Sequence, residues 1–131
     1  MIDLGDAIRI QEILIDKFGG SKGIRDIHLL ESALSRPFQT FDSKDLYPHP
    51  IDKAASLIES ILINHPFIDG NKRIGYVLMR LLLLDYGFDI QASEDEKYDF
   101  VISIAKGDYR FDDIVKWIKD KNTTGGNTAY K

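Results

Sequence analysis

A polar nine-residue stretch, His65–Arg73, separates two strongly apolar helical patterns in this chain of 131 residues. Apolar side chains surround much of the preceding segment, Ile51–Asn64, which is typical of a central helix. After the stretch, apolar residues recur at helical spacing at Ile74, Val77, Leu78, Leu81 and Leu82. The chain is therefore expected to fold around two buried helices, and the turn between them can hold polar side chains rigidly.

Helical spacing and cap signals predict an all-α bundle of about six helices in a single domain. The predicted helices are residues 3–18, Ile27–Ser35, Ile51–Asn64, Asn71–Tyr86, 93–106 and Tyr109–Lys121. Residues 20–23 are interpreted as a flexible connector. Residues 37–50 have no period, and at most a small hairpin is expected there. The predicted domain spans residues 1–121, and the polar residues 122–131 are expected to form a mobile tail.

Composition narrows the class of protein. The net charge of −4 argues against broad, direct nucleic-acid binding, which depends on neutralising phosphates. The chain contains no cysteine, so disulfide and thiolate chemistry are excluded. Its most apolar run, 77–84, contains Arg80 and is too short to span a membrane, and the first residues are acidic where a signal peptide would be basic. A cytoplasmic location is expected.

The polar stretch has the features of an anion site. Gly70 permits a backbone conformation that other residues rarely adopt, and Asn71 is a suitable cap for the helix that follows. A helix start presents unpaired N–H groups and the positive end of the helix dipole. Lys72 and Arg73 add two cations there, although two cations at this end of a helix are destabilising unless an anion binds. These residues predict a phosphate site.

Two further residues add possible chemistry. His65 has an unperturbed pKa that suits a general base near neutral pH, and the carboxylate of Asp69 can hold Mg²⁺ together with phosphate oxygens. Each residue also has a simpler interpretation: a structural histidine, a helix cap, or a solvated basic pair at Lys72–Arg73. Their adjacency favours function. Pro66 and Phe67 are interpreted as structural, the first stiffening the loop and the second anchoring it in the core.

The sequence of residues 65–73, His-Pro-Phe-Ile-Asp-Gly-Asn-Lys-Arg, resembles the signature of the Fic/Doc family, and its lysine is similar to the Doc (death-on-curing) branch. The resemblance extends upstream over Gly23–Asp26, Leu29–Leu34, Arg36-Pro37 and Tyr47-Pro48. It implies a nucleotide-dependent protein-modifying transferase with ATP as substrate and Mg²⁺ as cofactor. His65 would be the catalytic base, Asp69 the metal ligand, and Gly70, Asn71, Lys72 and Arg73 the phosphate-binding residues.

Two departures from the broader family signature bear on the product. Lys72 stands where that signature has a second glycine, and Tyr76 stands where it has a second arginine. The resemblance implies that a lysine fills the room needed for AMP transfer, so that ATP binds reversed and presents its γ-phosphate. Phosphoryl transfer to a Ser/Thr hydroxyl is therefore favoured. AMP transfer and a non-catalytic nucleotide- or partner-binding module stay open as alternatives.

The resemblance also implies partners. A bacterial toxin of this branch acts on a protein target, for which the family suggests elongation factor Tu, and thereby inhibits translation. The chain has no Ser/Thr-x-x-x-Glu-Gly/Asn motif of the kind that restrains many Fic proteins, so a separate antitoxin chain is expected. By the same resemblance, residues 37–50 are expected to form a flap beside the site that docks a segment of the target.

Overall fold

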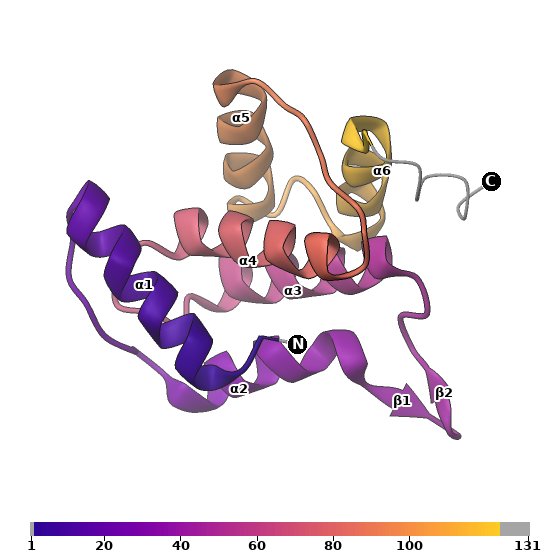
Figure 1. The fold of residues 1–131 in the computed structure, drawn as a ribbon, viewed down its shortest axis with the longest axis horizontal. Coiled ribbons are helices and arrows are strands. Elements are labelled where there is room, and N and C mark those ends of the chain that lie inside the picture. The colour runs from indigo at the N-terminus through magenta and orange to yellow at the C-terminus, as the bar shows by residue number, and fades with distance from the viewer. Residues whose placement is uncertain (1, 124–131) are drawn as a thin grey trace.

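The computed structural model describes residues 2–123, and within them six helices form one all-α bundle (Figure 1). The helices are α1 (Leu4–Phe18), α2 (Ile27–Ser35), α3 (Pro50–Asn64), α4 (Asn71–Asp85), α5 (Glu94–Ala105) and α6 (Phe111–Lys121). A short 3₁₀ helix, η1 (Arg36–Phe38), and a hairpin of β1 (Thr40–Phe41) and β2 (Lys44–Asp45) lie between α2 and α3. The predicted fold class and the small hairpin are confirmed.

Helices α3 and α4 lie side by side at the centre, with α1 and α2 on one side and α5 and α6 on the other (Figure 1). Gly75 allows their close approach, because a Cβ there would lie 3.2 Å from Leu62 Cδ2 and 3.4 Å from Ile61 Cγ2. Residues of both helices fill the core, and Ile58, Ile61 and Leu78 are fully buried. Within residues 2–123, no helix combines the length and the apolar character that crossing a membrane requires.

Side-chain caps fix the starts of three of the six helices in residues 2–123, close to where the sequence predicts them. Asp3 caps α1 and Asp26 caps α2, while Ser93 forms a capping box with Glu96 at α5. The last helix begins at Phe111 rather than Tyr109. The amides of Asp108 and Tyr109 instead turn back to the carbonyl of Ser103, at 2.9 and 3.0 Å, so the chain enters α6 later.

The link between α4 and α5 is tied to the end of α6. Ile90 forms an isolated antiparallel bridge with Asn122, and the amide of Thr123 donates to the carbonyl of Asp89 at 3.1 Å. The first two residues of the predicted tail therefore contact the bundle. The other residues of the predicted tail, 124–131, lie outside the described residues.

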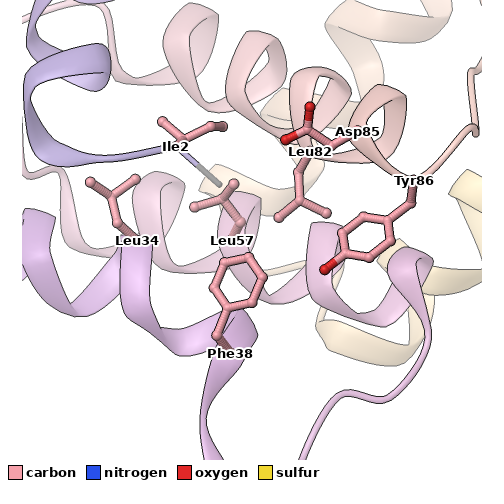
Figure 2. A pocket seen from close by; sticks show the side chains of 7 residues that line it. All are labelled: Ile2, Leu34, Phe38, Leu57, Leu82, Asp85 and Tyr86. Carbon is pink, nitrogen blue, oxygen red and sulfur yellow. The ribbon is translucent and has the colours of Figure 1, made fainter.

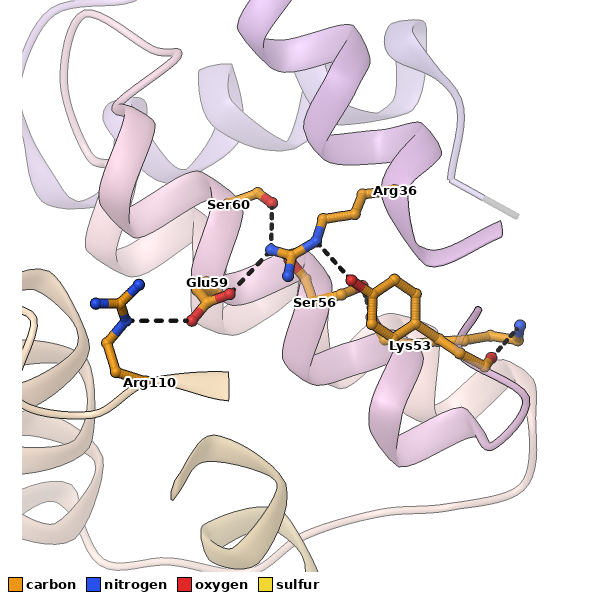
Figure 3. Close-up of polar contacts among 7 residues, drawn as sticks. Arg36, Lys53, Ser56, Glu59, Ser60 and Arg110 are labelled. Carbon is orange, nitrogen blue, oxygen red and sulfur yellow. Dashed lines mark hydrogen bonds and ion pairs between the residues drawn. The ribbon is translucent and has the colours of Figure 1, made fainter. Parts of the chain in front are cut away.

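The hairpin lies at the N-terminal end of α3, and its base is held by buried polar contacts (Figure 3). Lys53, only 5% exposed, donates from Nζ to the carbonyl of Tyr47 at 2.6 Å and to that of Pro37 at 3.2 Å. Arg36 donates to the Tyr47 hydroxyl at 3.1 Å and pairs with Glu59 at 3.0 Å. These contacts orient the hairpin from one end of α3.

A small cavity of about 300 Å³ lies between this end of α3, Ile2 and the C-terminal end of α4 (Figure 2). It is lined by Ile2, Leu34, Phe38, Leu57, Leu82, Asp85 and Tyr86. None of these residues belongs to the 65–73 stretch, so this cavity is distinct from the anion site that the sequence predicts.

Arg80 and Asp89 join α4 to the link that follows it, and this ion pair allows a test of the fold. Two hydrogen bonds of 2.9 and 3.2 Å connect the guanidinium to the carboxylate. The Arg80 guanidinium holds the pKa of the Asp89 carboxyl below its usual 3.8. The pair therefore stabilises the fold above that pH, and its contribution is lost as the pH falls through the lowered pKa.

We expect Asp89→Asn to lower the free energy of unfolding by about 0.5–1 kcal/mol at neutral pH, since the pair is partly exposed. The difference from the wild type should disappear in strong acid, which urea unfolding at several pH values would measure. Asp108→Asn is the control, because Asp108 faces Lys106 at 3.6 Å on an exposed surface and should change stability little. A deficit for Asp89→Asn that persists in acid would contradict the ion-pair explanation.

Candidate active site

The 65–73 stretch reverses the chain between α3 and α4 by two left-handed residues, at the left end of the bundle in Figure 1. His65 ends α3 with φ 49° and ψ 61°, and its amide donates to the carbonyl of Ile61 at 3.0 Å. Gly70 begins α4 with φ 76°. A non-glycine residue in the left-handed region is uncommon and often marks a functional position.

Phe67 and Asn71 fix the shape of this loop. The Phe67 side chain is 1% exposed. The Asn71 amide accepts from the Phe67 N–H and donates to the Phe67 carbonyl, both at 3.0 Å. The sequence predicted Asn71 as the helix cap, but Gly70 occupies that position, because the Asn71 side chain turns back to clamp the loop.

The connector between α1 and α2 is tied to the loop, so its interpretation as flexible is wrong. Ile24 and Phe67 form an isolated antiparallel bridge. The amide of Ile68 donates to the carbonyl of Gly23 at 3.0 Å. Arg25 donates from its guanidinium to the carbonyls of Asn64 and His65, at 2.5 and 2.6 Å. These carbonyls would otherwise be unpaired at the end of α3.

Backbone amides from two segments hold the Asp69 carboxylate. Gly70 N–H donates to Oδ1 and Ser21 N–H donates to Oδ2, each at 3.1 Å. The buried Gln11 of α1 donates to the carbonyls of both Asp69 and Ser21 at 3.2 Å. Asp69 is nevertheless exposed and lines a cleft together with the first residues of α4.

Lys72 and Arg73 are exposed in the first turn of α4. No acidic residue lies in that turn, and no side chain caps it. Neither cation forms an ion pair with a described residue. The guanidinium of Arg73 instead lies over the ring of Phe18, 4.0 Å from its centroid. Two cations therefore stand at the positive end of a helix dipole, as the sequence predicted, in an arrangement that favours a bound anion.

These groups line one open cleft of about 600 Å³, a size that suits a nucleotide. Leu14 and Phe18 form one wall, and α5 forms the opposite wall. The structure brings together the six residues that the sequence named for chemistry or binding, which are His65, Asp69, Gly70, Asn71, Lys72 and Arg73. Pro66 and Phe67, named as structural, are buried beneath them.

Residues 1–83 match the model of the Fic/DOC family, which covers more than half of the chain. The chain belongs to the Fic/DOC family. It is 36% identical over 99 residues to "Toxin Doc" of Mycolicibacterium smegmatis, covering 74% of this chain and 76% of that protein. It is 33% identical over 87 residues to a Fido domain-containing protein of Dictyostelium discoideum, covering 62% of this chain and 61% of that protein.

The chain is also similar to a "Protein adenylyltransferase Fic" of Drosophila persimilis. The two are 33% identical over 102 residues, which is 75% of this chain but 19% of the fly protein. Relatives named as a toxin and as an adenylyltransferase thus both match most of this chain. The family comparison establishes the class, and the choice between the products depends on the residues in the cleft.

Tyr76 is one such residue of the Fic/DOC cleft, standing where the broader signature has an arginine. Its ring packs edge-on against Phe100, with 6.4 Å between centroids, and Lys97 of α5 lies 5.7 Å from the ring centroid. Burial raises the pKa of the Tyr76 hydroxyl to about 12, so this group is neutral at physiological pH. It supplies no positive charge to a phosphate. Lys97 also lines the cleft, but it pairs with the cleft residue Glu94 at 3.2 Å.

Asp69 alone provides too few ligands for Mg²⁺, so the cleft fits this ion only when a bound phosphate supplies further oxygens. The described residues contain no group of three or more His, Cys, Asp or Glu side chains that could form a metal site. Mg²⁺ commonly binds through one or two carboxylates with phosphates and water completing its shell. Asp69 beside a cationic helix start matches that arrangement.

The hairpin does not lie beside the Fic/DOC cleft, so its predicted role as a substrate flap is wrong. No residue of 37–50 lines the cleft. The hairpin joins the first turns of α3, whereas the cleft begins after its last turn, and a helix of 15 residues is about 22 Å long. The connector that contains Ile24 occupies the position beside the loop instead.

Sequence reasoning missed four residues that build this site. Gln11 and Arg25 act on the loop through hydrogen bonds that no periodicity reveals, and Phe18 and Lys97 reach the cleft from α1 and α5. Gln11 offered one signal, because it is a polar residue on the otherwise apolar face of α1. Such a residue is usually buried with its hydrogen bonds satisfied.

Gln11→Met tests whether this side chain holds the loop. The variant keeps the length of the side chain but leaves the carbonyls of Ser21 and Asp69 without their donor, so we expect a loss of about 1–3 kcal/mol in unfolding free energy. Amide exchange at Ile68 should accelerate more than exchange in α6. The exposed neighbour Glu12, changed to Met, is the matched control. Equal exchange at Ile68 in the two variants would contradict this role.

Proposed function

We propose that this protein is a Doc-like toxin that transfers the γ-phosphate of ATP to a Ser or Thr hydroxyl of a protein target. The observation that carries the proposal is the convergence of His65, Asp69 and the two cations of α4 on one cleft of nucleotide size. The similarity to Toxin Doc of Mycolicibacterium smegmatis supports it.

His65 is the proposed general base. Its side chain lines the cleft and is exposed, so it can approach an incoming hydroxyl. The imidazole takes the hydroxyl proton while the oxygen attacks the γ-phosphorus. The bond from phosphorus to the bridging oxygen breaks, and ADP leaves. Arg25 holds the left-handed backbone of His65 through a hydrogen bond to the His65 carbonyl. This backbone fixes the direction of the Cα–Cβ bond of His65.

The phosphates are proposed to bind at the start of α4. The guanidinium of Arg73, the ammonium of Lys72 and the first amides of the helix neutralise their charge, which is the main requirement of phosphoryl transfer. Asp69 would hold Mg²⁺, which would offset the negative charge of the phosphates. Gly70 leaves the backbone open to the phosphates, and Asn71 keeps the loop in shape.

Lys72 and Tyr76 favour phosphate over AMP as the transferred group. Lys72 stands where the AMP-transferring signature has a glycine and would fill the space that the glycine leaves open. Tyr76 stands where that signature has a second arginine, and its neutral side chain brings no positive charge. Adenylyl transfer is the second candidate, because relatives named as adenylyltransferases match the same region. A binding module without turnover is the third.

The partners are part of the proposal. Elongation factor Tu in the cytoplasm of a bacterium is the proposed target, through which the toxin would inhibit translation. A separate antitoxin chain is the proposed restraint. We do not expect nucleic acid to be a direct partner, because the net charge of the chain is −4. We do not expect a membrane either, because the most apolar run, 77–84, is too short to span one.

His65→Ala should abolish transfer while ATP binding persists, because the phosphate site lies on other residues. Purified target is incubated with Mg·ATP, and its intact mass is measured. Wild-type protein should add the mass of one phosphate, whereas addition of one AMP would support the second candidate. The variant should lose at least about 100-fold in rate.

His28→Ala is the matched control for this experiment. His28 lies on α2, its side chain is 90% exposed, and it is absent from the cleft. The control should keep wild-type activity. If the His65→Ala variant remained toxic to cells, this result would contradict the catalytic proposal and favour the binding module.

Lys72→Gly and Lys72→Met together test the orientation of the nucleotide. If the bulk of the lysine excludes the AMP-transferring pose, the glycine variant should begin to add AMP to the target. The methionine variant keeps the bulk without the charge, so it should bind ATP more weakly and add no AMP. The product is identified by intact mass. AMP transfer by both variants, or by neither, would contradict the bulk argument.

A further inference from the structure

The Asp69 carboxylate is fixed at both oxygens before any ligand binds. Oδ1 accepts from the Gly70 amide within the loop, and Oδ2 accepts from the Ser21 amide in the connector. Two donors from separate segments define the plane of the carboxylate. Each oxygen has a second lone pair, so both can still bind a cation.

Gly20 provides the space that this arrangement needs. A Cβ on Gly20 would lie 2.8 Å from Asp69 Oδ2 and 3.1 Å from its Cγ. A distance under 3.0 Å requires one group to move, and φ at Gly20 is +113°. A Cβ there would therefore displace the carboxylate, and it would also lie 3.0 Å from Ile15 Cδ1.

Gln11 links the connector to the 65–73 loop through hydrogen bonds. Its Nε2 donates to the Ser21 and Asp69 carbonyls, and its Oε1 accepts from the Gly23 amide at 3.3 Å. The side chain is 2% exposed. One buried amide from α1 thus joins the connector to the backbone of Asp69, and movement of either segment would break its bonds.

We propose that Gly20, Ser21 and Gln11 are positioning residues that aim the Asp69 carboxylate at the magnesium of a bound Mg·ATP. This inference rests on the proposed function. Mg²⁺ requires nearly ideal octahedral geometry, so a rotated carboxylate binds it poorly. Groups that orient a metal ligand typically contribute 10- to 100-fold to metal affinity. The connector therefore controls the magnesium-dependent part of nucleotide binding.

Adjacent glycines allow a matched test. Gly19 and Gly20 both have positive φ, +91° and +113°, so alanine introduces backbone strain at either position. A Cβ at Gly19 meets no atom within 4 Å, whereas a Cβ at Gly20 meets the carboxylate. Gly19→Ala therefore reproduces the strain without the contact. Asp69→Asn shows the effect of removing the charge itself.

The experiment measures ATP affinity by calorimetry, with and without Mg²⁺, on the full chain of each variant. Magnesium should tighten ATP binding by the wild type and by Gly19→Ala. In Gly20→Ala that gain should fall about tenfold. Affinity without Mg²⁺ should be unchanged, because the cations of α4 are untouched. The amide resonance of Ser21 should shift in Asp69→Asn, which reports the hydrogen bond directly.

The outcomes separate the two proposals. An equal magnesium gain in Gly20→Ala and Gly19→Ala would overturn the positioning role and leave the proposed function intact. The absence of any magnesium gain in the wild type would overturn the proposed function and this inference with it. If Gly20→Ala does not fold, Gln11→Met decides, since it loosens the connector without a steric contact and should also reduce the gain.

Discussion

The burial of Phe67 is the contact on which the exposed loop depends. Its side chain is 1% exposed and belongs to the core, and this burial contributes roughly 1.5–3 kcal/mol. Its backbone is held on one side by the Asn71 amide and on the other by the bridge to Ile24. The residues around it, His65 and Asp69 among them, can therefore face solvent without making the loop mobile. An apolar anchor thus allows a polar surface to keep a fixed shape.

The start of α4 lacks the charges and caps that usually stabilise a helix start. The other long helices begin with an acidic residue or a side-chain cap, as α1 does with Asp3 and Asp6. In α4 the cap is a glycine, and the first turn carries Lys72 and Arg73. This arrangement is unfavourable for an isolated helix. The burial of Ile74, Leu78 and the rest of the apolar face compensates, so the helix forms although its first turn contradicts the local rule.

Local signals in the sequence were sufficient to predict the helices and the polar loop, but not the tertiary contacts between segments. Periodicity and caps predicted all six helices, and the concentration of polar residues at 65–73 predicted the cleft. The role of the connector could not be predicted in this way. Gln11 and Asp69 are 58 residues apart and Arg25 and His65 are 40 apart, and their bonds depend on tertiary packing. The predicted position of the hairpin beside the site was wrong for the same reason. The hairpin precedes α3 and the 65–73 loop follows it, so the helix holds them at opposite ends, and no local signal in the sequence shows this.

The two ends of α3 show how packing distinguishes structural from functional polar residues. Near its N-terminal end, Lys53 is buried and bonds to the carbonyls of Pro37 and Tyr47, so this charge stabilises the base of the hairpin (Figure 3). After its C-terminal end, Lys72 and Arg73 are exposed and have no ion-pair partner within residues 2–123. A buried charge requires its partner for the fold to exist. Cations without an ion-pair partner at the dipole end that repels them fit the proposed phosphate site, and this difference in pairing distinguishes the two ends of α3.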